Sequence, residues 1–310
     1  MNDARLTRRT FCGLCAAGTA AIHCREARAA QPAPHFALRY TLACSLFGCT
    51  KLEEILPEVR KVGAVGIDLL RSYPDDQREQ VGALGPKRFA ELLRQHNVRL
   101  DMTTRFDLGP FGLHMELGFL ADFGAKLVVT GSAGPRDLTG PECKKAVRQF
   151  IERMKPSVAE AESHGVTIAI ENHPLSLLST PDSLRYLVEL SKSPYLGIAF
   201  APSRLPQDEK LQGALIEDLG PRLVHFSAGQ YGRGWAQRLP KAQELEQMPG
   251  RGNLNFRLIL GSLRKVGYAG AVEIFMHPVP GGDPIMETTS QVTEEINHAR
   301  YYLEQCLGSA

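Results

Sequence analysis

Short apolar segments alternate with amphipathic ones along the chain from Leu38 onward. The short segments are rich in Val, Ile and Leu and are bounded by polar or glycine-containing stretches. Such runs are typical of strands that are buried on both faces of a parallel sheet. We expect eight of them, at residues 38–44, 64–70, 98–103, 126–130, 166–171, 196–200, 223–226 and 271–275.

The intervening segments carry apolar residues three and four positions apart, which is the spacing of one helix face. One such helix is expected to cover residues 52–63 and another residues 141–164. The second contains Pro156, which we expect to kink or divide it because proline lacks a backbone N–H. Thr180 followed by Pro181 is typical of a helix start, with an N-cap and a proline in the first turn.

Eight strands that alternate with helices predict a single (β/α)8 TIM barrel. The competing architecture is an open, doubly wound sheet, which commonly carries a glycine-rich phosphate loop after its first strand. No such loop follows residues 38–44, and no Pro/Ser-rich linker divides the chain. We therefore expect one barrel domain over residues 31–310.

Composition agrees with an ordinary soluble globular protein. The 310 residues are 43% hydrophobic and 23% charged, with a net charge of +2. Nucleic-acid binding normally requires a strongly basic face, and the Lys and Arg residues here are spread along the chain. We expect a small-molecule partner and no nucleic acid.

The first thirty residues resemble a twin-arginine export signal. Residues 7–11 (TRRTF) place an aromatic residue after an arginine pair, residues 13–22 are weakly apolar, and Ala27-Arg28-Ala29 offers a cleavage site. The apolar run is too short to span a bilayer permanently. We predict a cleaved signal over residues 1–30 and a periplasmic or otherwise extracytoplasmic protein; a disordered basic tail is the alternative.

Cleavage near residue 30 would leave four cysteines, namely Cys44, Cys49, Cys143 and Cys306. An oxidising compartment permits disulfides, and Cys44 and Cys49 are the nearest pair in sequence. Their spacing is not a strong zinc pattern, and a buried free thiol is the commoner outcome. The disulfide status stays open.

Three polar residues stand at or near the ends of the late strands: Glu171, His225 and Glu273. The C-terminal ends of barrel strands meet at one mouth, so these side chains are expected to lie close together. Two carboxylates and an imidazole can bind a divalent ion, and carboxylates can also transfer a proton between adjacent carbons. Taken singly, each residue is more often a solvated carboxylate or a hydrogen-bonded histidine.

The whole mature chain resembles the xylose isomerase-like TIM barrels, the sugar (phosphate) isomerase/epimerase group to which the endonuclease IV fold also belongs. The matching segments are IAIENH around Glu171, VHF around His225, and PGRGNLNF followed by GYAGAVEIF, which contains Glu273. The family binds its metal through Glu, Asp, His and Glu from strands five to eight. The resemblance implies that Glu171, His225 and Glu273 are metal ligands, and that the two Glu residues form the proton-transfer pair.

The sixth strand departs from the family pattern, in which the strand ends in Asp-Pro-x-His. Here GIAFAPSRL places Ala201 at the Asp position and Arg204 at the His position, and Ser227-Ala228 replace the Lys-Asp that usually follows the histidine. Ala201 has no donor oxygen, so a divalent ion (Mn, Mg, Zn or Co) is expected to bind weakly or not at all. Without a metal, Arg204 is a candidate cation to balance the carboxylates or to bind a substrate phosphate or carboxylate.

Other residues are expected to contact the substrate. His173 and Arg204 follow strands five and six, and His277 lies just beyond strand eight. Trp235 lies in a glycine-rich loop after strand seven that resembles a lid. Weaker candidates are Asp68, near the end of strand two, and Arg105, after strand three; an ordinary structural role explains any of these residues as well.

The sequence thus predicts a sugar isomerase or epimerase that moves a proton between adjacent carbons with help from a divalent metal. The alternative is a non-catalytic or metal-free barrel that binds a carbohydrate or an acidic ligand. An endonuclease IV-like phosphodiesterase is disfavoured, because that chemistry uses a three-metal cluster with more His ligands and a basic DNA face. The oligomeric state is left open.

Overall fold

The fold was analysed in a computed structural model that describes residues 36–233 and 237–308. The compact unit that begins at Phe36 contains all of these residues. The predicted export signal at residues 1–30 and the loop residue Trp235 lie outside the described residues.

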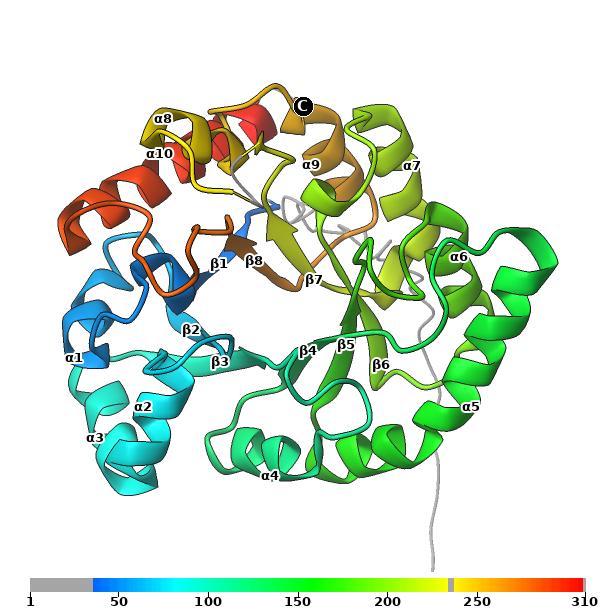
Figure 1. The fold of residues 1–310 in the computed structure, drawn as a ribbon, viewed down its shortest axis with the longest axis horizontal. Helices are drawn as coiled ribbons and strands as arrows, with labels where there is room; N and C mark the ends of the chain where they lie inside the picture. Colours follow the sequence, from blue (N-terminus) through cyan, green and yellow to red (C-terminus); the bar gives the residue numbers. More distant parts are fainter. Residues whose placement is uncertain (1–35, 234–236, 309–310) are drawn as a thin grey trace, which may run out of the picture. The chain divides into compact units, whose positions relative to one another are not determined.

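The described strands form one closed parallel barrel, which confirms the predicted fold (Figure 1). Each strand pairs with the next along the chain, and the last returns to the first, where Thr41 pairs with Glu273. The predicted strands are correct to within two residues at each end. The strands are β1 Arg39–Ala43, β2 Gly66–Leu70, β3 Arg99–Thr104, β4 Leu127–Gly131, β5 Thr167–Glu171, β6 Leu196–Phe200, β7 Leu223–Ala228 and β8 Ala271–Ile274.

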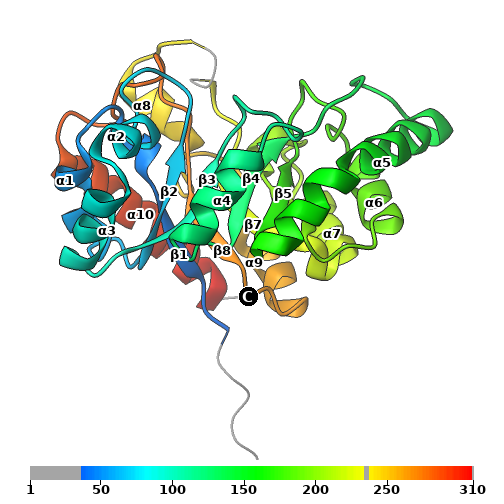
Figure 2. The same ribbon diagram turned by 90° about the horizontal axis from the view of Figure 1, so that it is seen from below.

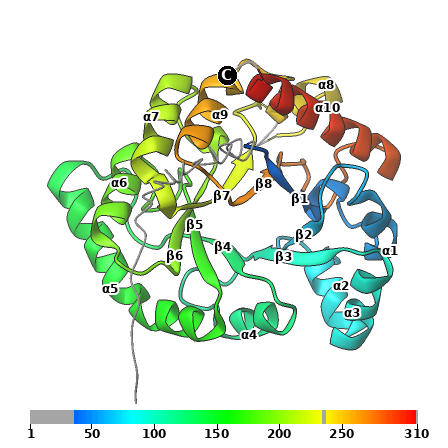
Figure 3. The same ribbon diagram turned by 180° about the vertical axis from the view of Figure 1, so that it is seen from behind.

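Helices surround this ring (Figures 1 and 3). The α-helices are α1 Leu52–Ile55, α2 Gln77–Leu84, α3 Pro86–Gln95, α4 His114–Asp122, α5 Gly140–His164, α6 Pro181–Leu190, α7 Glu209–Leu219, α8 Lys241–Glu244, α9 Phe256–Lys265 and α10 Thr289–Gly308. Short 3-10 turns are η1 Cys44–Phe47, η2 Leu56–Glu58, η3 Pro202–Arg204, η4 Gly220–Arg222 and η6 Leu245–Gln247. The N-cap predicted at Thr180 is confirmed, since its side chain accepts a hydrogen bond from the Ser183 N–H.

Two predicted helices differ from the observed ones, both at prolines. The helix expected over 52–63 stops as an α-helix at Ile55 and continues as the 3-10 turn η2, which contains Pro57. A kink or a division of α5 was expected at Pro156, and the division is wrong, because one helix runs from Gly140 to His164. Proline removes one backbone hydrogen bond, and buried residues on both sides of Pro156 hold α5 against the barrel.

The main hydrophobic core lies between the strands and the outer helices. Its largest fully buried side chains are phenylalanines, among them Phe200 on β6 and Phe226 on β7, whose rings stack with centroids 6.2 Å apart. A second, smaller cluster of buried residues brings together Met102, Val129, Ala169 and Ala199, one from each of β3 to β6.

The loops that follow the strands gather at one end of the barrel, the upper end in Figure 2. The four cysteines predicted to remain after cleavage are all free thiols, so the structure contains no disulfide among them. Within residues 36–233 and 237–308, no helix is both long enough and apolar enough to cross a bilayer.

Candidate functional site

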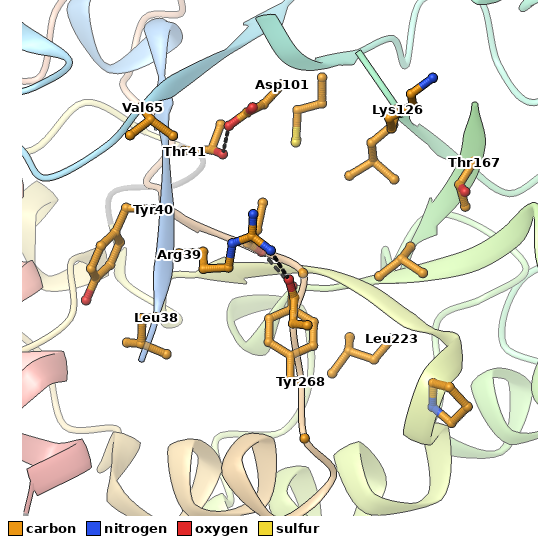
Figure 4. Close-up of a pocket in the computed structure, with 18 of the residues that line it drawn as sticks. Leu38, Arg39, Tyr40, Thr41, Val65, Asp101, Lys126, Thr167, Leu223 and Tyr268 are labelled. Carbon is orange, nitrogen blue, oxygen red and sulfur yellow. Dashed lines mark hydrogen bonds between the residues drawn. The ribbon is translucent and has the colours of Figure 1, made fainter. Parts of the chain in front are cut away.

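Two cavities lie at opposite ends of the barrel. The larger, about 720 Å³, is lined by residues at the N-terminal ends of the strands, among them Arg39, Asp101 and Lys126 (Figure 4). Here the Thr41 hydroxyl donates to Oδ2 of Asp101 over 2.6 Å, and Arg39 donates to a backbone carbonyl. In TIM barrels this end serves stability, and catalysis takes place at the other.

The smaller cavity, about 270 Å³, lies at the C-terminal ends of the strands. Six of the predicted site residues line it together: Glu171, His173, Arg204, His225, Glu273 and His277. Further lining residues were not predicted; they come from the segments after β1, β2, β3 and β8 and include Ser45, Tyr73, Phe106 and Phe275. Their only signal was their position at or just after the end of a strand. We call this cavity the mouth.

The end of β5 is tied to the end of β6 by Asn172, a residue that the sequence reading did not single out. Its fully buried side chain accepts a hydrogen bond from the Ala201 N–H over 2.8 Å and donates one to the Ala201 carbonyl over 3.0 Å. This reciprocal pair fixes the chain immediately before η3. The adjacent Glu171 is thereby held at a constant place relative to Arg204.

Glu171 and Arg204 form the charged half of the mouth. Burial raises the pKa of the Glu171 carboxyl, while the charges of Arg204 and His225 lower it. Burial also lowers the pKa of Arg204, and the Glu171 carboxylate opposes that shift. An arginine side chain stays charged in proteins, so its guanidinium favours the ionised form of Glu171.

Glu273 lies in a different setting, beside Asp68 and His225. Its Oε2 is 3.4 Å from Nε2 of His225, and its carboxyl is within hydrogen-bonding reach of the Asp68 carboxyl. Asp68 Oδ2 accepts the Thr104 hydroxyl over 2.8 Å, which leaves Oδ1 of Asp68 and Oε1 of Glu273 without donors if both groups are ionised. One shared proton supplies the missing donor.

The pKa shifts agree with that shared proton. Burial raises the pKa of Glu273 to about 8, with a hydrogen bond to Asp68 lowering it and the charge of Glu171 raising it. Burial and the charge of Glu273 raise the pKa of Asp68 well above its usual value. Burial lowers the pKa of His225 to about 4, so its imidazole is neutral at pH 7. At neutral pH the mouth therefore holds the guanidinium of Arg204 beside Glu171, and a protonated acid pair at Glu273 and Asp68.

His277 fixes the orientation of Arg204. A guanidinium nitrogen of Arg204 contacts Nε2 of His277, and since arginine can only donate, the imidazole accepts through that nitrogen. Burial, Arg204 and His173 lower the pKa of His277 to about 3, so it is neutral. Its backbone is held by reciprocal hydrogen bonds to the Gln247 side chain at 3.1 and 3.0 Å, and its ring stands edge-on to Phe275, with centroids 4.8 Å apart.

His173 and Arg105 were both predicted as candidates for the mouth, and only His173 lines it. His173 lines the mouth, where its Nδ1 accepts the Leu175 N–H over 3.2 Å and where burial and Arg204 lower its pKa to about 4. Arg105 does not line the mouth. Its guanidinium forms ion pairs with Asp107 and the buried Glu116 instead, since a buried carboxylate needs a cation.

The donor set of the mouth does not fit a resident divalent ion. Ala201 occupies the predicted fourth ligand position with a methyl group, and both of its backbone polar groups are used by Asn172. Among the described residues, no group of three or more His, Cys, Asp or Glu side chains is placed to hold a metal ion. We therefore assign no chemical step to a metal, and the ligand roles of Glu171, His225 and Glu273 stay predictions.

Comparison with known proteins identifies the family of folds. Residues 56–300 match the family model described as xylose isomerase-like TIM barrel. No curated protein sequence matches the chain.

Solved structures match the chain over most of their own length. A D-psicose 3-epimerase in the presence of D-fructose has a TM-score of 0.65 and 16% identity, covering 87% of this chain and 100% of that one. A probable 3-DHS dehydratase of Bacillus anthracis, involved in petrobactin synthesis, has a TM-score of 0.62 and 14% identity, covering 84% and 97%. The IOLI protein with a bound zinc atom has a TM-score of 0.64 and 16% identity, covering 87% and 98%.

Proposed function

Because the chain belongs to the xylose isomerase-like TIM barrel family, we propose that it is an enzyme of the sugar isomerase/epimerase type. Its reaction is the transfer of a proton to or from a carbon next to a carbonyl group in a sugar or sugar derivative. Glu171 and Glu273 are the proposed acid/base residues.

One observation carries this proposal: two carboxyl groups in unlike environments face the same mouth. Glu171 lies beside the guanidinium of Arg204, which favours its ionised form, and Glu273 lies beside Asp68 in a buried acid pair that retains a proton. Titratable groups whose environments push their pKa values apart mark an acid and a base. We therefore assign the role of base to Glu171, beside the cation, and the role of acid to Glu273, in the acid pair.

The two residues approach the substrate from different sides, because β5 and β8 are separated in the ring by β6 and β7. Glu171 removes the proton from the carbon, the C–H electron pair forms a carbon–carbon double bond, and the carbonyl electrons move to oxygen. Glu273 returns a proton to a carbon of the resulting enediolate. Return to the opposite face of the same carbon gives epimerisation. In isomerisation the proton returns to the former carbonyl carbon, while the hydroxyl proton of the first carbon passes to the oxyanion and that carbon becomes the new carbonyl.

The size and lining of the mouth support a small polar substrate. A cavity of about 270 Å³ is at the lower limit for small-molecule sites. Hydroxyl groups of Ser45, Ser72, Tyr73 and Ser227 line it next to the aromatic rings of Phe106 and Phe275. Such a mixture offers hydrogen-bond partners and an apolar face to a sugar ring. The epimerase named among the similar structures acts by this class of chemistry, at an identity that supports the fold alone.

Solvent exchange measures the proposed step directly. The protein is incubated in D2O with a panel of ketoses, aldoses and sugar acids, and NMR follows the replacement of carbon-bound hydrogen by deuterium. We expect Glu171→Gln and Glu273→Gln each to slow exchange by about 10²–10⁴-fold, the usual contribution of a positioned acid or base. Glu54→Gln, at an exposed position of α1, is the matched control. Exchange that Glu171→Gln leaves unchanged would refute the role of Glu171, and exchange absent from the wild type with every substrate would favour the non-catalytic binding alternative.

A further inference from the structure

Arg204 projects into the mouth from a rigid turn. It is the last residue of η3, three positions after Ala201, and its backbone N–H donates to the Ala201 carbonyl over 3.1 Å. Asn172 holds both polar groups of Ala201, so the base of the turn is fixed to the end of β5. The side chain that the turn carries lines the mouth together with Glu171.

The guanidinium also has a fixed partner at its outer end. It donates to Nε2 of His277, whose backbone is held by Gln247 and whose ring packs against Phe275. The charged groups that act on Arg204 include Glu171, while His173 and His277 are neutral neighbours at pH 7. The mouth therefore contains a permanent positive charge, the guanidinium of Arg204, which lies near Glu171 at the end of β5 and contacts His277 in the loop after β8.

The same position is unfavourable for a divalent ion. A metal bound by Glu171 would lie next to a guanidinium, so like charges would repel where Ala201 has already removed one carboxylate ligand. The end of β6 thus differs from the family pattern in two ways: Ala201 stands in place of an acidic ligand, and Arg204 adds a positive charge. Each lowers the affinity for a metal, and together they leave the mouth with a cation of its own.

We infer that the guanidinium of Arg204 takes the place of the divalent metal ion in this mouth and binds the substrate oxygen on which negative charge develops. This inference rests on the proposed function for its catalytic part. As Glu171 takes the proton from carbon, the carbonyl electrons move to oxygen, and N–H donors of Arg204 hold that oxyanion until Glu273 returns a proton. Preorganised donors of this kind stabilise charge without a metal. Arg204 is then a catalytic residue, since it touches the reacting oxygen.

Metal binding tests the inference without any assay of turnover. The full chain is purified without chelator, its metal content is measured by mass spectrometry, and Mn²⁺ alone is titrated by calorimetry. We expect no stoichiometric metal in the wild type and weak or no Mn²⁺ binding. The double variant Ala201→Asp/Arg204→His restores the ligand and removes the cation, and its Mn²⁺ affinity should rise by at least about 10–100-fold. Thermal melting by circular dichroism checks that the variant is folded.

Two metal results would overturn the inference. One is a wild-type protein that retains about one equivalent of divalent metal and loses it on Glu171→Gln. The other is a folded double variant whose Mn²⁺ affinity equals that of the wild type, since Ala201 and Arg204 would then not control the site. Both results can be obtained whether or not a substrate is found.

The exchange assay tests the catalytic part. We expect Arg204→Gln to slow exchange by about 10²–10³-fold, as for the loss of one oxyanion donor, and EDTA to have no effect. Arg136→Gln, at an exposed arginine outside the mouth, should leave the rate unchanged. Exchange that EDTA abolishes and Mn²⁺ restores would overturn the role of Arg204. Exchange absent from the wild type with every substrate would refute the proposed function, and the Mn²⁺ titrations would still decide whether Arg204 excludes the metal.

Discussion

At the scale of single residues, the mouth is governed by what lies next to each carboxyl group. Glu171 and Glu273 are chemically identical side chains, yet one faces a guanidinium and the other faces a second carboxyl. These neighbours act on the two pKa values in different ways: the guanidinium lowers that of Glu171, and the acid pair retains a proton at Glu273. The acid pair of Asp68 and Glu273 also has a consequence for stability, because a buried group that retains its proton makes folding depend on pH.

We expect the free energy of unfolding to fall as pH rises from about 6.5 to 8. The pKa of Glu273 is raised to about 8, so in this range the native state binds more protons than the unfolded state and stability decreases with pH. Below this range the lowered pKa values of His173, His225 and His277 act in the opposite direction, because the unfolded state binds the additional protons. Urea unfolding at a series of pH values measures the slope.

Glu273→Gln should flatten the upper part of that curve, since the amide cannot ionise and can donate to Asp68. Glu54→Gln should leave the slope as in the wild type, because Glu54 is exposed. Parallel curves for the wild type and Glu273→Gln would show that Glu273 does not carry the raised pKa.

Site residues were predictable where they lie on or just after one of the late strands. Glu171, His225 and Glu273 could be found because strand ends converge in a barrel, and all three line the mouth. The partners that decide their chemistry were not predictable in the same way. The contact between Asp68 and Glu273 depends on the register of β8 against β1 and of β1 against β2, which the pattern of apolar residues does not specify.

At the scale of elements, the two hydrogen bonds between the Asn172 side chain and the Ala201 backbone, here called the clamp, link the ends of β5 and β6. Glu171 ends β5, and Arg204 lies in the turn that follows β6. Asn172→Ala would leave the buried N–H of Ala201 without a partner and remove one of the two donors to its carbonyl, and we expect it to lower the free energy of unfolding by about 1–3 kcal/mol. Asn253→Ala, at an exposed position, should change it by less than about 0.5 kcal/mol. Denaturant unfolding compares the two. Equal effects would mean that the clamp adds nothing to the stability of the fold.

Two glycines differ in the space around them, one in a strand of the barrel and one in an outer helix. A Cβ built on Gly197 of β6 would lie 2.6 Å from Cγ2 of Val224 on β7, whereas one built on Gly82 of α2 meets no atom within 4 Å. Gly197→Ala should therefore destabilise the protein by about 1–3 kcal/mol. Gly82→Ala should stabilise it by about 0.5–1 kcal/mol, because alanine favours the helix. A shift of the same sign in both melting curves would contradict this account.

Periodicity predicted the strands well because each is a buried apolar run with polar ends. It predicted the helices less well where a proline lies within the apolar pattern, because the pattern does not show whether the helix continues through the proline. Pro57 turns the helix after β1 into a 3-10 segment, while Pro156 is accommodated within α5, which is anchored by buried residues on both sides. The helices α2, α7 and α8 were not predicted; α2 and α8 are short and have few buried apolar residues.

At the scale of the whole molecule, the barrel separates two functions between its two ends. The N-terminal end encloses the larger cavity, with ordinary polar contacts such as that of Thr41 with Asp101. The C-terminal end holds the smaller cavity and the buried titratable groups. Volume alone would therefore point to the wrong end, and the chemistry of the lining residues identifies the mouth.

The closure of the ring between β1 and β8 has a consequence for the synthesis of the protein. Thr41 finds its partner strand only when Glu273 has left the ribosome. At a usual elongation rate that interval is on the order of 10–50 s. Throughout it, the nascent chain carries an open parallel edge on β1 and another on its newest strand, and both attract foreign strands. A stalled or truncated product would keep both edges open and is expected to aggregate.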